Sequence, residues 1–470
     1  MMFPADSNTL GLGQQITPHN SSFKDPSGFV FMQDGMVYRQ INHSYSHHYD
    51  HLLSSGLYQE LVNQNWLIAH TEINSATPIA DAYKIIRPQT VRHISYPYEW
   101  SFSQLKAAAL LTLKIARKSL AFKMILKDAT PFNIQFHNGK PVFIDTLSFE
   151  CYREGTPWVA YRQFCETFLA PLALMSYRDG SANAALTTHI HGLPMKQTAT
   201  ALPFSSYFNV GLLMHIHLQA WFQGNASQGK PNTKVRELSK QRLEAMLSHL
   251  EKTVSNLSLQ TNKGVWGAYY QTGVLDQEYV VEKSSVIEQF IANRSYSSAI
   301  DLGSNSGHFS RLLASKGIHV VAVDSEHSCI DELYQVCKTD TIENILPLLI
   351  DLSNPTPAIG WMNTERGSFM ERFASRDLVV ALALVHHLAI GRNVPFAKIA
   401  AFCAQLGEDL IIEFVPKSDP KVQLLLAHRE DVFVQYTSKD FHEAFQQYYN
   451  LMEEVAIAGT ERVLYLFKKK

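Results

Sequence analysis

The sequence predicts an α/β protein, with a doubly wound, Rossmann-like sheet in its C-terminal part and an α+β domain before it. Two observations carry this prediction. After residue 260, short apolar runs alternate with amphipathic helical patterns, which is typical of a parallel sheet covered on both faces. Residues 299–324 also show the pattern of a strand, a glycine turn, a helix and a second strand. The 470 residues allow several domains, which we place at 1–222 and 265–470, joined by a linker and bridging helix over 223–264.

The amino-acid composition limits which cellular compartment and which binding partners are expected. The 41 Lys and Arg residues nearly balance the 43 Asp and Glu residues, so the broad basic surface of a nucleic-acid-binding protein is not expected. The five cysteines lie far apart without a C-x-x-C pair, which argues against a disulfide framework or a structural zinc site. No secretion signal or membrane-spanning run is recognisable. We therefore expect a cytoplasmic protein without a membrane partner, in an oligomeric state that the sequence does not indicate.

Three stretches of the N-terminal domain carry clear local signals. The segment "GFVFMQDGMVYRQI" predicts a hairpin. A helix is expected after Ser101, a candidate cap, because apolar residues follow at helical spacing, namely Leu105, Ala108, Leu111 and Ile115. The segments "NIQF" and "PVFID" flank Asn138-Gly139, a strong hairpin-turn signal.

The domain boundary is expected where apolar residues thin out, in "FQGNASQGKPNTK". A helix over about 235–257 should follow, because its apolar residues keep the three-and-four spacing of one helical face. In the C-terminal domain, acids or imidazoles stand where the predicted strands end: Asp301, Asp324, Asp351, His386 with His387, and Glu413. Ligands of such sheets bind outside the carboxyl ends of the strands, so these residues form the candidate site.

The spacing of the glycine turn favours one kind of ligand. A dinucleotide fingerprint needs a second glycine where this chain has Asn305, which hinders close approach of a diphosphate. Asp324, 21 residues after Gly303, is placed to accept from two ribose hydroxyls, and Asp351 could accept from an adenine amine. Asp301 would repel phosphate but could attract a cationic amino-acid head group. These acids suit a nucleoside without phosphates, such as S-adenosylmethionine.

Four segments in order, "AIDLGSNSGHFS", "VVAVDSE", "PLLIDLSNP" and "DLVVALALVHHL", resemble the motifs of class I S-adenosylmethionine-dependent methyltransferases. In wider detail, "ALALVHHLAIG" and "LIIEFVPKSDPKV" are similar to a bacterial group related to a rhizobial nodulation protein, whose members share the N-terminal half. The resemblance implies a methyltransferase sheet over the C-terminal domain. It also implies that Asp324 holds the ribose, that Asp351 faces the adenine, and that four residues wrap the methionine part: Gly303, Ser304, Asn305 and Gly307.

The acceptor side of the site is expected around His386 and His387. Methyl transfer to a hydroxyl requires removal of its proton, which a histidine near neutral pKa can perform. Either histidine could instead cap the strand or line the cofactor pocket. Glu413 could orient an imidazole or accept from the substrate, and Lys283 could reach the methionine carboxylate. An aromatic set, Trp266, Tyr269, Tyr270 and Tyr279, could form a lid over the sulfonium or only pack beneath the linker helix.

The N-terminal domain carries a second constellation. Asp128 stands five residues before Asn133, and Asp145 stands twelve after it. This spacing resembles the catalytic loop and metal-binding acid of protein-kinase-like and aminoglycoside-phosphotransferase-like folds. The resemblance implies Asp128 as the base and Asn133 and Asp145 as magnesium ligands in a Mg-ATP site. Arg39 would take the place of the nucleotide-binding lysine, with Glu60 as a candidate partner.

Departures from the kinase pattern leave the role of this domain open. Leu126-Lys127 replaces His-Arg, Thr146-Leu147 replaces Phe-Gly, and no G-x-G-x-x-G is present. The leading hypothesis is a methyltransferase whose N-terminal domain recognises a small acceptor, such as a carbohydrate hydroxyl. The alternatives are a bifunctional kinase and methyltransferase acting on one acceptor, a cofactor-binding regulator, or an RNA methyltransferase. The double histidine supports the RNA alternative and the charge balance opposes it.

Overall fold

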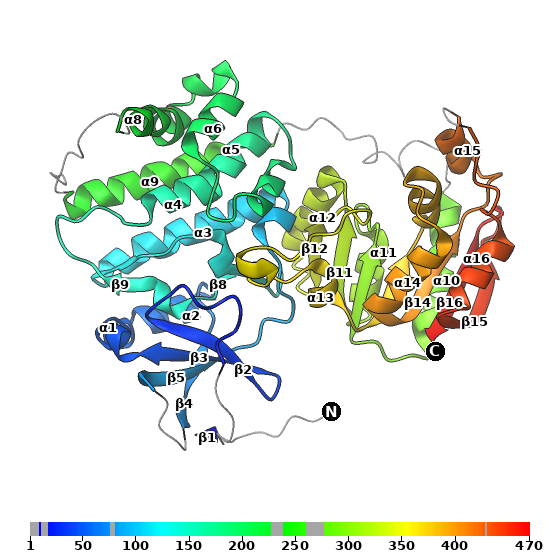
Figure 1. The fold of residues 1–470 in the computed structure, drawn as a ribbon, viewed down its shortest axis with the longest axis horizontal. Helices are drawn as coiled ribbons and strands as arrows, with labels where there is room; N and C mark the ends of the chain where they lie inside the picture. Colours follow the sequence, from blue (N-terminus) through cyan, green and yellow to red (C-terminus); the bar gives the residue numbers. More distant parts are fainter. Residues whose placement is uncertain (1–8, 11–16, 76–79, 227–237, 260–276, 428–429) are drawn as a thin grey trace. The chain divides into compact units, whose positions relative to one another are not determined.

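The computed structural model describes residues 9–10, 17–75, 80–226, 238–259, 277–427 and 430–470 (Figure 1). The chain divides into two compact units. Unit 1 comprises residues 1–260 together with 358–367, and unit 2 comprises 261–357 and 368–470. Part of the predicted linker, 223–264, lies outside the described residues, as do Trp266, Tyr269 and Tyr270.

Unit 1 begins with a five-stranded sheet in the order β1-β4-β5-β3-β2. Its strands are β1 (Thr9–Leu10), β2 (Gly28–Gln33), β3 (Met36–Asn42), β4 (His70–Ser75) and β5 (Ala82–Pro88). The strands β2 and β3 pair antiparallel, which confirms the hairpin predicted in this stretch. Two helices connect β3 to β4, namely α1 (Ser46–Ser54) and α2 (Leu57–Asn63).

The rest of unit 1 is built around the helix α3 (Phe102–Ala121). The Ser101 side chain accepts from the backbone N–H of Gln104, so the predicted cap is confirmed. Two short antiparallel pairs follow, formed by β6 (Met124–Leu126) with β9 (Phe149–Cys151) and by β7 (Ile134–His137) with β8 (Lys140–Phe143). Asn138 and Gly139 both have positive φ, at 50° and 71°, in the predicted hairpin turn.

Helices complete unit 1. They are α4 (Tyr161–Phe164), α5 (Ala170–Tyr177), α6 (Met195–Ala201), α7 (Val210–Leu212), α8 (Leu218–Ala226) and α9 (Lys240–Asn256). The helix predicted over 235–257 is α9, which packs against α3 through its apolar face. The segment 358–367 also belongs to this unit, where Glu365 pairs with Lys24 at 2.8 Å.

Unit 2 is a seven-stranded sheet with the order β12-β11-β10-β13-β14-β16-β15. Its strands are β10 (Ser298–Leu302), β11 (His319–Asp324), β12 (Ile345–Leu349), β13 (Arg376–Ala381), β14 (Gly407–Phe414), β15 (Tyr449–Ala456) and β16 (Val463–Lys469). Its helices are α10 (Gln277–Ala292), α11 (His308–Ser315), α12 (His327–Thr339), α13 (Phe369–Phe373), α14 (Phe396–Leu406), α15 (Pro420–Leu426) and α16 (Ser438–Phe445).

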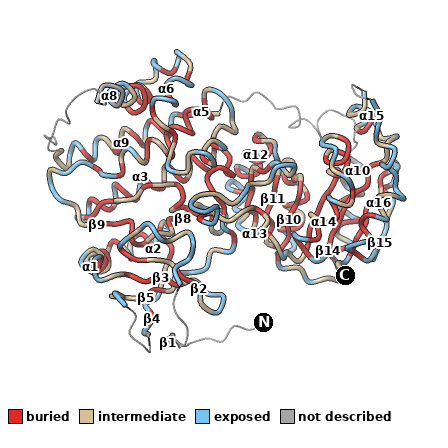
Figure 2. Tube along the Cα trace, in the orientation of Figure 1, coloured by how far each residue is buried: buried red, intermediate tan, exposed pale blue. Residues whose placement is uncertain are grey.

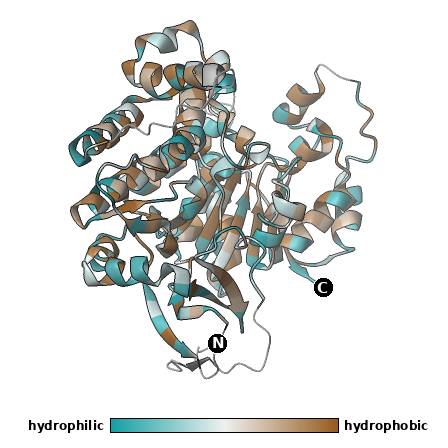
Figure 3. Ribbon diagram, turned by 60° about the vertical axis from the view of Figure 1, so that its left-hand side comes forward, coloured by the Kyte–Doolittle hydropathy of each residue, from teal (hydrophilic) through white to brown (hydrophobic). Residues whose placement is uncertain are grey.

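The first five strands of this sheet are parallel, and β16 inserts antiparallel between β14 and β15. All five residues of β10 are buried, and burial continues along its neighbours (Figure 2). Apolar residues follow the same strands (Figure 3), as expected for a sheet that helices cover on both faces. The strand order reverses at β10, because β11 and β13 lie on its opposite sides. Such a switch point opens a crevice at the carboxyl ends of the strands.

Two findings concern the whole described chain. The five cysteines are free, as expected for a protein without a disulfide framework. Among the helices that the structure describes, none combines the length and the apolar character needed to cross a bilayer.

Candidate active site

The turn between β10 and α11 forms one side of the switch-point crevice. Gly303, Asn305 and Gly307 all have positive φ, at 76°, 49° and 78°. Asparagine tolerates this conformation better than most residues, so the missing second glycine does not prevent the turn. A Cβ atom on Gly307 would approach the Leu333 side chain to 2.3 Å, so glycine is also required here for packing.

Asp324, at the end of β11, is hydrogen-bonded to the backbone of this turn. One carboxylate oxygen accepts the backbone N–H of Asn305 at 2.8 Å, and the other accepts that of Glu326 at 2.8 Å. Burial raises the pKa of Asp324, and the two backbone N–H groups oppose that rise. A carboxylate has about four lone-pair sites, so Asp324 keeps capacity to accept from a ligand hydroxyl.

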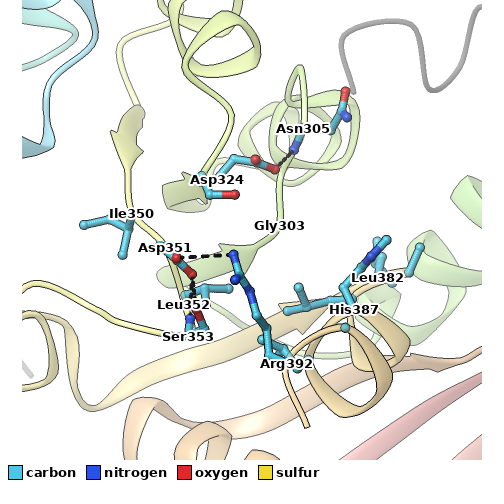
Figure 4. Close-up of a pocket in the computed structure, with 15 residues that line it drawn as sticks. Gly303, Asn305, Asp324, Ile350, Asp351, Leu352, Ser353, Leu382, His387 and Arg392 are labelled. Carbon is cyan, nitrogen blue, oxygen red and sulfur yellow. Dashed lines mark hydrogen bonds and ion pairs between the residues drawn. The ribbon is translucent and has the colours of Figure 1, made fainter. Parts of the chain in front are cut away.

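A pocket lies between this turn and the ends of β12 and β13 (Figure 4). Five of the predicted site residues line it: Gly303, Asn305, Asp324, Asp351 and His387. Asp351 accepts from the backbone N–H and the hydroxyl of Ser353, at 2.8 and 2.6 Å, and pairs with Arg392 at 3.7 Å. The pocket therefore has carboxylates on the β11 and β12 side and an imidazole on the β13 side.

The other residues predicted to bind the cofactor lie around this pocket. Asp301 is buried and accepts from the Ser310 hydroxyl at 2.6 Å, and burial raises its pKa to about 6. Ser304 is buried as well, and Gly307 caps α11. None of these three is among the residues that line the pocket, and their predicted contacts with the cofactor stay predictions.

The two histidines follow β13 directly. His387 lines the pocket at the start of a π-helical turn, and its ring centre lies 4.2 Å from that of His386. His386 is fully buried and does not line the pocket. Burial, with the charges of Lys421 and Arg462, lowers the pKa of His387 to about 4, and burial lowers that of His386 as well. Both imidazoles are therefore neutral at physiological pH, and His387 is the one with access to a ligand.

Glu413 and Lys283 are not among the residues that line the pocket. The Lys283 ammonium lies 2.5 Å from the Glu413 carboxylate, and both side chains are buried outside the pocket lining. The roles predicted for Lys283 at the methionine carboxylate and for Glu413 beside an imidazole or the substrate stay predictions, because both side chains are engaged with each other in this structure. Tyr279, from the predicted aromatic set, is buried beside them and donates to Glu413 at 2.6 Å.

In unit 1, the residues predicted to form a Mg-ATP site come together. Asp145 pairs with Arg39 of β3 at 2.7 Å and accepts from the Ser148 hydroxyl, which also accepts from Asn133 at 3.1 Å. Asp128 accepts from Gln163 at 2.8 Å, and its pKa is raised by burial and by the charge of Asp145.

Two further findings concern the charged groups of unit 1. Glu60 pairs with Lys118, so it is not the partner of Arg39 that the sequence suggested. Within the described ranges, no group of three or more His, Cys, Asp or Glu side chains is arranged to hold a metal ion.

Arg392 is a pocket residue that sequence reasoning missed. It stands five residues after His387, beyond the π-helical turn, and faces Asp351 across the pocket. The only signal in the sequence is a basic residue shortly after a strand end, which is common on protein surfaces. Its pairing with Asp351 joins residues 41 positions apart, which no local sequence pattern indicates.

Nodulation protein NoeA of Rhizobium meliloti (strain 1021) is 34% identical over 477 residues, which is 99% of this chain and 99% of that protein. No protein-family model matches the chain.

Among solved structures, the bifunctional kinase-methyltransferase WbdD is 18% identical with a TM-score of 0.30, over 44% of this chain and 43% of WbdD. The N-methyltransferase NodS from Bradyrhizobium japonicum WM9 is 13% identical with a TM-score of 0.31, over 41% of this chain and 98% of NodS. Magnesium protoporphyrin IX methyltransferase from Synechocystis PCC 6803 is 16% identical with a TM-score of 0.32, over 44% of this chain and 92% of that enzyme. These scores are too low to assign a function.

Proposed function

Because the chain belongs to the family of nodulation protein NoeA and unit 2 has the class I methyltransferase fold, we propose that it transfers the methyl group of S-adenosylmethionine to a hydroxyl of a carbohydrate or other small acceptor. Family membership agrees with the resemblance predicted from the sequence motifs. One observation carries the proposal: the glycine turn, Asp324 and Asp351 surround a single pocket at the switch point of the sheet.

The residues present fit this cofactor. Asp324 would accept from the ribose hydroxyls, since a carboxylate has about four lone-pair sites and so keeps capacity for a ligand after binding the backbone. Asp351 would accept the adenine amine, and the turn from Gly303 to Gly307 would enclose the methionine part. This turn contains no Lys or Arg, so it offers no charge to a diphosphate. When bound, S-adenosylmethionine supplies an electrophilic methyl group on a sulfonium.

His387 is the proposed base for the acceptor hydroxyl. Its imidazole is neutral, it lines the pocket, and it lies on the β13 side, across from the predicted ribose ligand Asp324. The unprotonated imidazole can take the hydroxyl proton as the oxygen attacks the methyl carbon, and its pKa of about 4 makes it a weaker base than the near-neutral histidine expected from the sequence. His386, buried behind it, would help to hold its ring.

Methyl transfer is tested by incubating the full chain with methyl-tritiated S-adenosylmethionine and a polar metabolite and oligosaccharide extract. We expect label in a small, alkali-stable product, as for a methyl ether, and much less label with His387→Gln. Label in an alkali-labile ester would contradict the hydroxyl acceptor. Label that ribonuclease releases would favour the RNA alternative instead.

We propose that unit 1 has a kinase-like fold and serves as the recognition module for the acceptor, with the reaction in the cytoplasm. The Asp145 carboxylate is already paired with Arg39, and Asp128 is bonded to Gln163, which supports a site retained for binding. Phosphoryl transfer is the second candidate, because Asp128, Asn133 and Asp145 share one hydrogen-bonded cluster with the spacing of a kinase loop.

A further inference from the structure

A cluster of buried charges lies in unit 2, behind the wall of the pocket. It contains two cations and two carboxylates, whose side chains are 1%, 0%, 1% and 10% exposed: Lys283, Glu413, Arg462 and Asp419. Arg462 donates to both oxygens of Asp419, at 2.7 and 3.0 Å, and to the hydroxyl of Tyr279 at 2.8 Å. The four charges cancel, so the cluster satisfies the condition under which buried ions are tolerated.

Glu413 is the centre of this cluster. One oxygen accepts from Lys283 at 2.5 Å, and the other accepts from Tyr279 at 2.6 Å. Burial alone would raise the pKa of Glu413, but the charges of Lys283 and Arg462 hold it below its ordinary value. The carboxylate therefore stays ionised in the interior of the unit, where it is a strong hydrogen-bond acceptor.

A further hydrogen bond links the cluster to the pocket. The Glu413 oxygen that binds Lys283 also accepts the backbone N–H of Ala383 at 2.7 Å. Ala383 has a φ of 49°, an uncommon conformation for alanine that needs support from its surroundings. Leu382, Ala383 and Leu384 all line the pocket, so this bond holds a strained piece of the pocket wall.

The same turn carries the proposed base. The backbone N–H of His387 donates to the carbonyl oxygen of Leu384 at 3.0 Å. Leu384 also packs against the glycine turn, since a Cβ atom on Gly303 would lie 3.3 Å from its side chain. A displacement of Ala383 would therefore also displace the proposed base His387 and the glycine turn at Gly303.

We propose that Glu413, held in place by Lys283 and Arg462, is a positioning residue that fixes the Ala383 turn and thereby the wall that carries His387. The functional part of this inference rests on the proposed methyltransferase activity. Lys283 in turn serves to neutralise Glu413. Its ammonium also lies over the rings of Phe309 and Tyr279, at 4.9 and 5.3 Å, so its surroundings are complete without a ligand.

Two double variants test the bond to Ala383. Lys283→Met/Glu413→Gln and Lys283→Met/Glu413→Leu both remove the buried ion pair and leave Arg462 balanced by Asp419. Only glutamine keeps an oxygen for the Ala383 N–H, and leucine also removes the polar group beside the Tyr279 hydroxyl. Amide hydrogen exchange of residues 383–388 in the ligand-free full chain should be faster by about tenfold or more in the leucine variant than in the glutamine variant. Equal exchange in the two would overturn the proposal.

A variant that removes an ion pair at the surface serves as the control, because it shows whether losing any ion pair of this unit changes the exchange. Glu408 and Lys469 form an exposed pair at 3.4 Å, with Glu408 on the same strand as Glu413. Glu408→Leu/Lys469→Met should leave exchange over 383–388 unchanged. If this variant accelerated exchange as much as the buried leucine variant, the positioning role of Glu413 would be refuted.

A second measurement separates positioning from direct cofactor binding. S-adenosylhomocysteine carries the amino-acid carboxylate, whereas 5′-methylthioadenosine lacks it. The proposal predicts that the leucine variant weakens both ligands by the same factor. A loss restricted to S-adenosylhomocysteine would show that Lys283 binds the carboxylate and would overturn the proposal. If the unmodified chain bound neither ligand, the proposed function would fail, and the exchange experiment would still decide the role of Glu413.

Discussion

Asp324 illustrates how much of the site follows from single residues. Its position could be predicted, because an acid after the apolar run of β11 must lie at the carboxyl edge of the sheet. Its two backbone partners, Asn305 and Glu326, could not be predicted, since they depend on the left-handed turn at Asn305. The same limit applies to Lys283 and Glu413, whose pairing joins residues 130 positions apart.

The charge of Asp324 can be tested with a near-isosteric change. Asp324→Asn keeps one oxygen for the backbone but replaces the other with an amide donor. We expect affinity for S-adenosylhomocysteine to fall by about tenfold or more, because hydrogen bonds to a charged group contribute roughly 1.5–3 kcal/mol. The measurement is isothermal titration. Asp340→Asn, on an exposed residue at the end of α12, is the matched control and should bind as the parent does.

The His387 imidazole is expected to stay unprotonated well below neutral pH. Burial and the nearby cations lower its pKa to about 4, so the ring should stay neutral from pH 7 down to about pH 5. Protonation should then appear as pH falls through the folded-state value. Histidine-selective NMR titration of the ligand-free chain, with His387→Gln to assign the signal, measures this directly. A midpoint near 6.5 would mean that the ring is solvated and not held in the wall of the pocket.

Among the helices, strands and turns, those whose geometry depends only on neighbouring residues were predicted correctly. Ser101 caps α3 and Asn138-Gly139 turns the β7–β8 hairpin, because both motifs need only neighbouring residues. The motif-bearing parallel strands of unit 2 were also predicted, since buried strands appear as continuous apolar runs. The π-helical turn after β13 was not predicted, because packing around it determines that geometry.

Gly307, in the glycine turn of unit 2, should tolerate alanine less well than Gly317 does. Gly307 and Gly317 have nearly the same φ, 78° and 81°, but only Gly307 has a neighbour, Leu333, close to the position of a Cβ atom. Gly317→Ala should therefore cost only the backbone strain, about 1 kcal/mol, whereas Gly307→Ala adds a steric clash and should cost roughly 1–3 kcal/mol more. Urea denaturation of both variants measures the difference. Equal losses of stability would show that Leu333 moves aside freely.

At the scale of the whole molecule, the sequence indicated two functional regions, and the structure adds a detail that no sequence pattern showed. The segment 358–367 interrupts unit 2 in the sequence but packs with unit 1, through Glu365 with Lys24 and through Arg366 over the ring of Phe132. Packing between residues far apart in the chain produces no periodic pattern in the local sequence, so it could not be predicted. Similarity to NoeA over 99% of the chain indicates that both units belong to the family as a whole.

The role of unit 1 can be decided on the full chain. As a recognition module it should show no magnesium-dependent binding of ATP, because Asp145 is paired with Arg39. Isothermal titration with Mg-ATP and with ATP in the presence of a chelator measures this. Magnesium-dependent binding that Asp145→Ala abolishes would contradict the recognition role and favour the bifunctional enzyme.

The most direct test of the central claim is titration of the full chain with S-adenosylhomocysteine and, separately, with NAD. We expect one-to-one binding of S-adenosylhomocysteine and no binding of NAD, because the pocket offers carboxylates to a nucleoside and no basic residue in its glycine turn to a diphosphate. Binding of NAD without S-adenosylhomocysteine would contradict the assignment of the pocket and, with it, the methyltransferase function.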